Sequence, residues 1–128
     1  MTPVFLGLEE ALEIHRDQIE RYGGSFGLRD MGLLQSALAM PQAGSGGQYF
    51  HADPYEMAAA LLFHIVKNHP FVDGNKRVGA MAAFTFFKLN GITLKAPEPA
   101  FEKVVLSVAE GMSDKAAVAR FFRKHSKA

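Results

Sequence analysis

The sequence predicts a single all-α domain of about six helices, and three observations support this fold class. Apolar residues recur at helical spacing along most of the chain, as in residues 8–22. Helix-ending residues such as Gly23-Gly24 and Gly91 separate these segments. A length of 128 residues, with 48% hydrophobic and 21% charged residues, is typical of one globular domain with its own core. We therefore treat residues 1–128 as one domain.

The first part of the chain contains two predicted helices and a long loop. Residues 8–22 form an amphipathic helix, with glutamates in its early turns and Arg21 near its end, as the helix dipole favours. Residues 29–40 form a shorter helix that ends before Pro41. Residues 41–53 have no hydrophobic period and contain three glycines. Long loops in small domains are often lids or binding segments, although a flexible connector is an equal alternative.

Two helices at the centre of the chain are joined by a short polar loop. Asp53 is the expected N-cap of the first of them, and Pro54 fits its first turn. This helix runs to about residue 68. The next helix, 75–90, is apolar on nearly every side from Val78 onward. Because it lacks a polar face, we expect it to lie in the middle of the domain.

The C-terminal part adds two more helices and one short strand. The helices are expected at about 97–110 and 114–123, the second capped by Asp114. Residues 92–94 could form a short strand paired with residues 4–6. That pairing would add a minor two-stranded β element to an otherwise helical fold.

Composition limits the classes of partner and compartment. The chain has 14 Lys plus Arg against 13 Asp plus Glu, so its formal charge of +1 offers no overall field for nucleic acid or a membrane. It has no cysteine, which excludes disulfides and fits a reducing compartment. The first residues do not have the pattern of a signal peptide, and the most apolar stretch, 78–89, is too short to cross a bilayer. We expect a cytoplasmic protein with no direct nucleic-acid or membrane partner.

Residues 69–77, HPFVDGNKR, are the segment that predicts chemistry. Pro70 disfavours helical geometry at residue 69, so the preceding helix ends there. A loop that leads into a helix presents unpaired N–H groups and the positive end of the helix dipole, which together bind anions. Lys76 and Arg77 add two positive side chains at the same place. A phosphate group is therefore the expected ligand.

His69 and Asp73 complete the expected site. A histidine beside a phosphate can take a proton from an incoming hydroxyl, because its pKa is normally near neutrality. An aspartate beside phosphates can hold a magnesium ion. Each residue taken alone has an ordinary alternative, such as a structural histidine, an Asp-Gly turn or a solvated helix start. Their combination in nine residues favours phosphoryl or nucleotidyl transfer.

The same segment resembles the signature of the Fic/Doc family, which is roughly His-Pro-Phe-x-[Asp/Glu]-Gly-Asn-[Gly/Lys]-Arg. Every fixed position matches. The stretches IERYGGSFGLRDMGLLQSALAMPQA and FKLNG also resemble the death-on-curing branch of that family. On this resemblance the chain is identified as a member of the family.

The resemblance implies a role for each residue of the segment. His69 would be the general base, Asp73 would bind Mg²⁺, and Phe71 would be structural. The anion site would consist of Gly74 and Asn75, through backbone and side-chain amides, together with Lys76 and Arg77. The loop 41–53 would be a flap that holds the target protein in extended form.

Two positions separate the branches of the family. Members that transfer AMP usually have Gly where this chain has Lys76, and a second Arg where it has Ala80. The death-on-curing pattern implies a kinase that transfers the terminal phosphate of ATP, or of another nucleoside triphosphate, to a Ser/Thr hydroxyl. Its implied target is elongation factor Tu, and the implied result is arrested translation.

The resemblance also implies that the protein is the toxin of a toxin–antitoxin system, and that a partner restrains it. The inhibitory Ser/Thr-x-x-x-Glu helix of some family members has no copy here, since residues 107–111 have Glu at the wrong spacing. A separate antitoxin, Phd-like or other, would cover an exposed apolar groove and block the site. The alternatives are an AMP or other nucleotidyl transferase and an inactive binding module of the same fold. A metal hydrolase that uses His64 and His69 is disfavoured, because the helix end between them places them on different faces.

Overall fold

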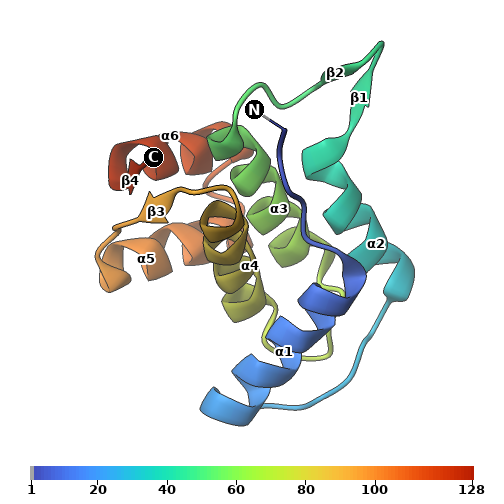
Figure 1. The fold of residues 1–128 in the computed structure, drawn as a ribbon. Helices are drawn as coiled ribbons and strands as arrows, with labels where there is room; N and C mark the ends of the chain where they lie inside the picture. The colour runs from blue at the N-terminus through green and yellow to red at the C-terminus, as the bar shows by residue number, and fades with distance from the viewer. Residues whose placement is uncertain (1) are drawn as a thin grey trace.

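The computed structural model describes residues 2–128, in which six helices form one packed unit (Figure 1). The helices are α1 (Leu8–Tyr22), α2 (Met31–Ala39), α3 (Pro54–Asn68), α4 (Asn75–Leu89), α5 (Glu98–Ala109) and α6 (Lys115–His125), and a 3-10 turn, η1, covers Met40–Gln42. The strands are β1 (Gly44–Ser45), β2 (Gln48–Tyr49), β3 (Thr93–Leu94) and β4 (Ser126–Lys127). The prediction of a mainly helical domain with six helices is confirmed.

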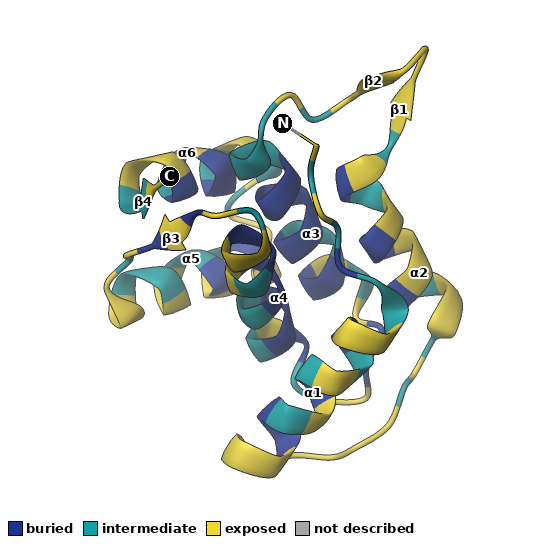
Figure 2. Ribbon diagram, viewed as in Figure 1, coloured by how far each residue is buried: buried dark blue, intermediate teal, exposed yellow. Residues whose placement is uncertain are grey.

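The helix at the centre of the domain is α3. It packs against α2, α4, α5 and α6, and most of its length is buried (Figure 2). We predicted that α4, which is apolar on nearly every side, would lie in the middle of the domain. It packs against α1, α3 and α5, but it is not buried all round. One side of α4 reaches the surface at Lys76, Phe84 and Lys88, and the Phe84 side chain is 40% exposed. Phe86, on the opposite side, and Phe87 are fully buried in the core.

The strand at 92–94 has a different partner from the predicted one. β3 pairs antiparallel with β4, so that Thr93 lies opposite Lys127 and Leu94 opposite Ser126. Figure 1 shows the end of the chain returning to β3 after α6. Residues 4–6 form no strand. The Asn90 side chain holds the N-terminal segment instead, because it bonds both the N–H and the C=O of Val4 at 2.8 and 2.9 Å.

The predicted loop 41–53 contains a small antiparallel hairpin, β1–β2, which lies exposed at the surface. The segment has no hydrophobic period because each strand has two residues and both of its faces lie in solvent. One contact fixes it to the domain: the Tyr49 ring lies 5.6 Å from the Phe5 ring, which lies 6.0 Å from that of Phe86. The hairpin is therefore anchored to the C-terminal half of α4. Within residues 2–128, no helix is long and apolar enough to cross a membrane.

A histidine–lysine contact joins α3 to the start of α6. The His64 Nε2 atom lies 3.2 Å from Lys115 Nζ and accepts a hydrogen bond from this ammonium group, so Nε2 carries no proton and the imidazole is neutral. Burial, the positive charge of Lys115 and the nearby His51 lower the pKa of His64 to about 4. The folded protein thus keeps His64 neutral at pH values at which a free histidine is charged.

This contact predicts that the protein loses stability as the pH falls from about 6.5 to about 4. In that window the unfolded chain binds a proton at His64 and the folded chain does not, so acid favours unfolding. Because His64 is partly exposed, we expect a loss of about 1–2 kcal/mol after solvent screening. Urea unfolding at neutral and acidic pH measures it. In His64→Gln, which cannot titrate, the pH dependence should be weaker, and equal pH dependence would contradict this assignment.

Candidate active site

The loop between α3 and α4 begins with an unusual backbone conformation at His69. This residue ends α3 with φ 53° and ψ 52°, and it is the sole non-glycine residue of 2–128 with a positive φ. Its side chain is exposed, whereas Pro70 and Phe71 are buried. Gly74 is also left-handed and precedes the first residue of α4. The predicted helix–loop–helix arrangement of residues 69–77 is confirmed.

A second segment, residues 23–30, crosses this loop and pairs with it. Leu28 forms an isolated antiparallel bridge with Phe71. The N–H of Arg29 donates to Pro70 O at 2.7 Å, and the N–H of Val72 donates to Gly27 O at 3.0 Å. We did not assign segment 23–30 to the site from the sequence. The one sequence feature that could have indicated this contact is the presence of three glycines in the segment, because glycine lets two backbones approach closely.

Asn75 supports the loop from inside. Its side-chain Oδ1 accepts from the N–H of Phe71, and its Nδ2 donates to Phe71 O, both at 2.9 Å. The side chain is 4% exposed, so it completes the backbone pairing of Phe71 as a neighbouring strand would. Phe71 engages Oδ1 and one of the two hydrogens of Nδ2. The backbone N–H of Asn75 and the second Nδ2 hydrogen are therefore its possible contributions to an anion site.

His15 of α1 packs beneath the loop. Its ring stacks on that of Phe71, with centroids 4.0 Å apart and planes 6° apart, and the residue is 5% exposed. Its Nε2 lies 3.0 Å from Asp73 O, and because a carbonyl can only accept, Nε2 carries the proton. The sequence placed His15 on the apolar face of a helix and gave no sign of this contact, which joins residues 58 positions apart.

Asp73 is held as an exposed carboxylate. The N–H of Ser25 donates to its Oδ2 at 3.1 Å, and the N–H of Gly74 donates to its Oδ1 at 2.8 Å. These bonds lower the pKa of Asp73, and the charges of Arg77 and His15 add to the effect. An ionised carboxylate with its remaining lone pairs in solvent fits Mg²⁺, which commonly uses one or two protein carboxylates with phosphates and water. Within residues 2–128 no group of three His, Asp or Glu forms a ligand set.

Arg77 joins the start of α4 to the end of α1. Its Nη1 donates to Gln18 O at 3.3 Å and its Nη2 to Gly23 O at 2.9 Å. Gly23 is the C-cap of α1, where acceptors have no partner in the helix, and Gln18 lies in the turn before it. Lys76 is exposed beside it. The structure therefore gives Arg77 a structural contact in addition to its charge near the loop.

The first turn of α4 leaves backbone donors free. Gly74 provides no side-chain cap, and in the described part of the chain no group accepts from the N–H of Asn75, Lys76 or Arg77. Because these N–H groups lie at the positive end of the helix dipole, they can bind an anion. They follow directly after the Asp73 carboxylate, so a phosphate and its metal ion could be held at one place.

The hairpin does not flank this site, contrary to the expectation for loop 41–53. β1 and β2 lie beyond the N-terminal end of α3, whereas loop 69–74 follows its C-terminal end (Figure 1). The 15 residues of α3 span about 22 Å, which separates the two. The extended segment beside the site is residues 23–30.

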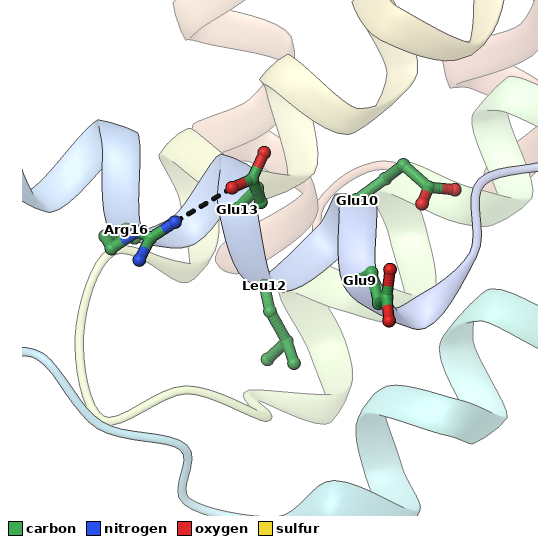
Figure 3. Close-up of a pocket in the computed structure, with 5 residues that line it drawn as sticks. All are labelled: Glu9, Glu10, Leu12, Glu13 and Arg16. Carbon is green, nitrogen blue, oxygen red and sulfur yellow. Dashed lines mark hydrogen bonds and ion pairs between the residues drawn. The ribbon is translucent and has the colours of Figure 1, made fainter.

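Two surface hollows lie away from the loop. One, of about 650 Å³, is lined by α1 residues and is mainly acidic (Figure 3). Its lining residues are Glu9, Glu10, Leu12, Glu13 and Arg16, with Glu13 and Arg16 paired at 2.8 Å. The other, of about 510 Å³, lies at the α5–α6 turn and includes Phe63 and Met112. Neither includes residues 69–77, and the acidic lining of the first disfavours phosphate.

The chain matches a known protein family. Residues 5–87 match the Fic/DOC family, a range that includes both residues 69–77 and segment 23–30. The chain belongs to this family.

Two relatives carry more particular names. The chain is similar to "Toxin Doc" of Mycolicibacterium smegmatis, with 45% identity over 75 residues, which cover 59% of this chain and 58% of that protein. It is also similar to "Protein kinase doc" of Escherichia phage P1, with 28% identity over 116 residues, which cover 91% of this chain and 90% of that protein. The first match thus spans less than two thirds of the relative, and the second spans most of it.

The contact between Gly24 and Asp73 predicts a sensitive position in segment 23–30. A Cβ at Gly24, where φ is 117°, would lie 2.7 Å from Asp73 Oδ2, whereas a Cβ at Gly23, where φ is 84°, would meet no atom within 4 Å. Both Gly→Ala changes strain the backbone, but only Gly24→Ala displaces the carboxylate. We expect it to lower the free energy of unfolding by about 1 kcal/mol more than Gly23→Ala does, because the displaced atoms are the ends of side chains. Urea unfolding compares them, and equal losses would contradict the contact.

Proposed function

We propose that this protein is the toxin of a toxin–antitoxin system and a Mg²⁺-dependent protein kinase that acts in the cytoplasm. It transfers the terminal phosphate of ATP, or of another nucleoside triphosphate, to a Ser/Thr hydroxyl of a target protein. The observation that carries the proposal is the loop 69–77, where an exposed histidine, a fixed carboxylate and free helix N–H groups follow one another. Membership of the Fic/DOC family supports it.

Each part of the loop has a chemical task in this proposal. The His69 imidazole takes the proton from the target hydroxyl. The Asp73 carboxylate holds Mg²⁺, which neutralises charge on the phosphates when it is bound. The N–H groups of residues 75–77 and the charges of Lys76 and Arg77 orient the phosphates, while the N–H of Gly74 holds the Asp73 carboxylate beside them. Most of the rate enhancement then comes from positioning and charge, as expected for phosphoryl transfer.

Two positions of α4 support the choice of the terminal phosphate, rather than AMP, as the group that is transferred. Lys76 adds a positive charge on the exposed side of the helix, where AMP-transferring members usually have Gly. Ala80, on the next turn, offers no guanidinium to hold the other end of the nucleotide. These residues support transfer of the terminal phosphate rather than of AMP. The similarity to a protein named a protein kinase supports the same choice.

The proposed partners follow from the same relatives. A chain similar to a protein named a toxin is expected to have a cognate antitoxin, Phd-like or other. The proposed target is a translation factor, elongation factor Tu, whose modification would arrest translation.

The proposed reaction predicts which phosphate of ATP is transferred. The purified protein is incubated with Mg²⁺, elongation factor Tu and ATP labelled on either the α or the γ phosphate. We expect label on the factor from γ-labelled ATP alone. Label from the α position would show nucleotidyl transfer, and no label from either would contradict the proposed kinase with this target and nucleotide.

The role of His69 predicts that His69→Ala abolishes transfer. Loss of a general base lowers the rate by about 10²- to 10⁴-fold. Because the His69 side chain is exposed, the fold and its thermal midpoint should change little. His125→Ala, at the end of α6, is the matched control and should keep full activity. Undiminished transfer by His69→Ala would remove this residue as the base.

A further inference from the structure

Arg29 binds three consecutive carbonyl groups at the end of α3. Its Nε donates to His69 O at 2.6 Å and its Nη2 donates to Asn68 O at 2.9 Å. Its own backbone N–H donates to Pro70 O at 2.7 Å. One residue of segment 23–30 thus holds the peptide groups on both sides of the His69 α-carbon.

These contacts coincide with the unusual conformation of His69. A left-handed residue other than glycine persists only where its surroundings fix it, because the conformation places Cβ close to the backbone. The last carbonyls of a helix also lack partners, and an arginine can bind them with its fork of N–H groups. Arg29 satisfies both requirements at one place.

The surrounding contacts make this arrangement rigid. The Asn68 side chain donates to Leu33 O at 3.0 Å, and the N–H of Asp30 donates to Pro70 O at 2.9 Å. Asp30 is also the N-cap of α2, where its side chain accepts from the N–H of Leu33. The end of α3 and the start of α2 therefore form one hydrogen-bonded unit that contains His69.

We propose that Arg29 is a positioning residue for His69, which holds the left-handed backbone that aims the imidazole at the site. Arg29 acts through the His69 backbone and takes no part in proton transfer. The expected effect on kcat rests on the proposed function. The expected effect on the His69 backbone does not. Lysine cannot replace Arg29, because a single ammonium group lacks the planar fork that reaches two carbonyls at once.

The test compares Arg29→Lys and Arg29→Gln in the full chain with Arg16→Lys. Arg16 is an exposed arginine paired with Glu13 on α1 and serves as the matched control. NMR of isotope-labelled protein follows the backbone carbon shifts of His69, which distinguish a left-handed residue from other conformations. Transfer kinetics with ATP and the target protein give kcat and KM, and thermal unfolding gives the midpoint.

We expect the His69 shifts to leave the left-handed range in both Arg29 variants, with the signals of α3 and α4 unchanged. We expect kcat to fall about 10- to 100-fold at unchanged KM for ATP, because a small misplacement of a reacting group costs this much. Arg16→Lys should change neither. If Arg29 had a purely structural role, its substitution would lower the thermal midpoint without this change in kcat.

Two further outcomes would overturn the proposal. One is unchanged His69 shifts with unchanged kcat in Arg29→Lys and Arg29→Gln. The other is loss of the whole fold in both variants, which would assign Arg29 to stability. If the unmodified protein transfers no phosphate, the proposed function fails, and the His69 shifts alone then decide whether Arg29 holds the loop.

Discussion

Two short stretches of extended backbone, residues 27–29 and 70–72, hydrogen-bond to each other where α3 ends. This contact fixes the loop that joins the two helices at the centre of the domain, and the rest of the site depends on it. His15 and Asn75 support the same loop from below, through a ring stacked on Phe71 and an amide that pairs with its backbone. A loop with its polar groups satisfied in this way is held in one conformation.

The same contacts decide which groups remain free for chemistry. The Asn75 side chain and two nitrogens of Arg77 have backbone partners, whereas the first N–H groups of α4 and the outer lone pairs of Asp73 have none in the described part of the chain. The His69 imidazole is exposed at the other end of the loop. In our proposal the segment combines a rigid inner side, which sets geometry, with an outer side that binds metal ion and phosphate.

Local features of the sequence predicted the helices well and indicated residues 69–77 as the segment of expected chemistry. Residues 8–22 and 54–68 have clear periods and end signals, and their predicted limits agree with α1 and α3. Contacts between distant residues were not predictable, because hydrophobic periodicity does not show them. The pairing of β3 with β4 and the bonds of Arg29 to residues 68–70 are examples. The exposed side of α4 was missed because small apolar residues and Phe84 are tolerated at a surface.

The central claim is that the start of α4 is the phosphate site, and amide shifts on nucleotide binding test it most directly. Mg²⁺ and ATP are titrated into ¹⁵N-labelled protein, and the backbone amide signals of residues 2–128 are followed. We predict the largest shifts at Asn75, Lys76 and Arg77, because their free N–H groups would donate to phosphate oxygens. Largest shifts in the acidic hollow of α1 or at the α5–α6 turn, with residues 74–77 unaffected, would contradict the account.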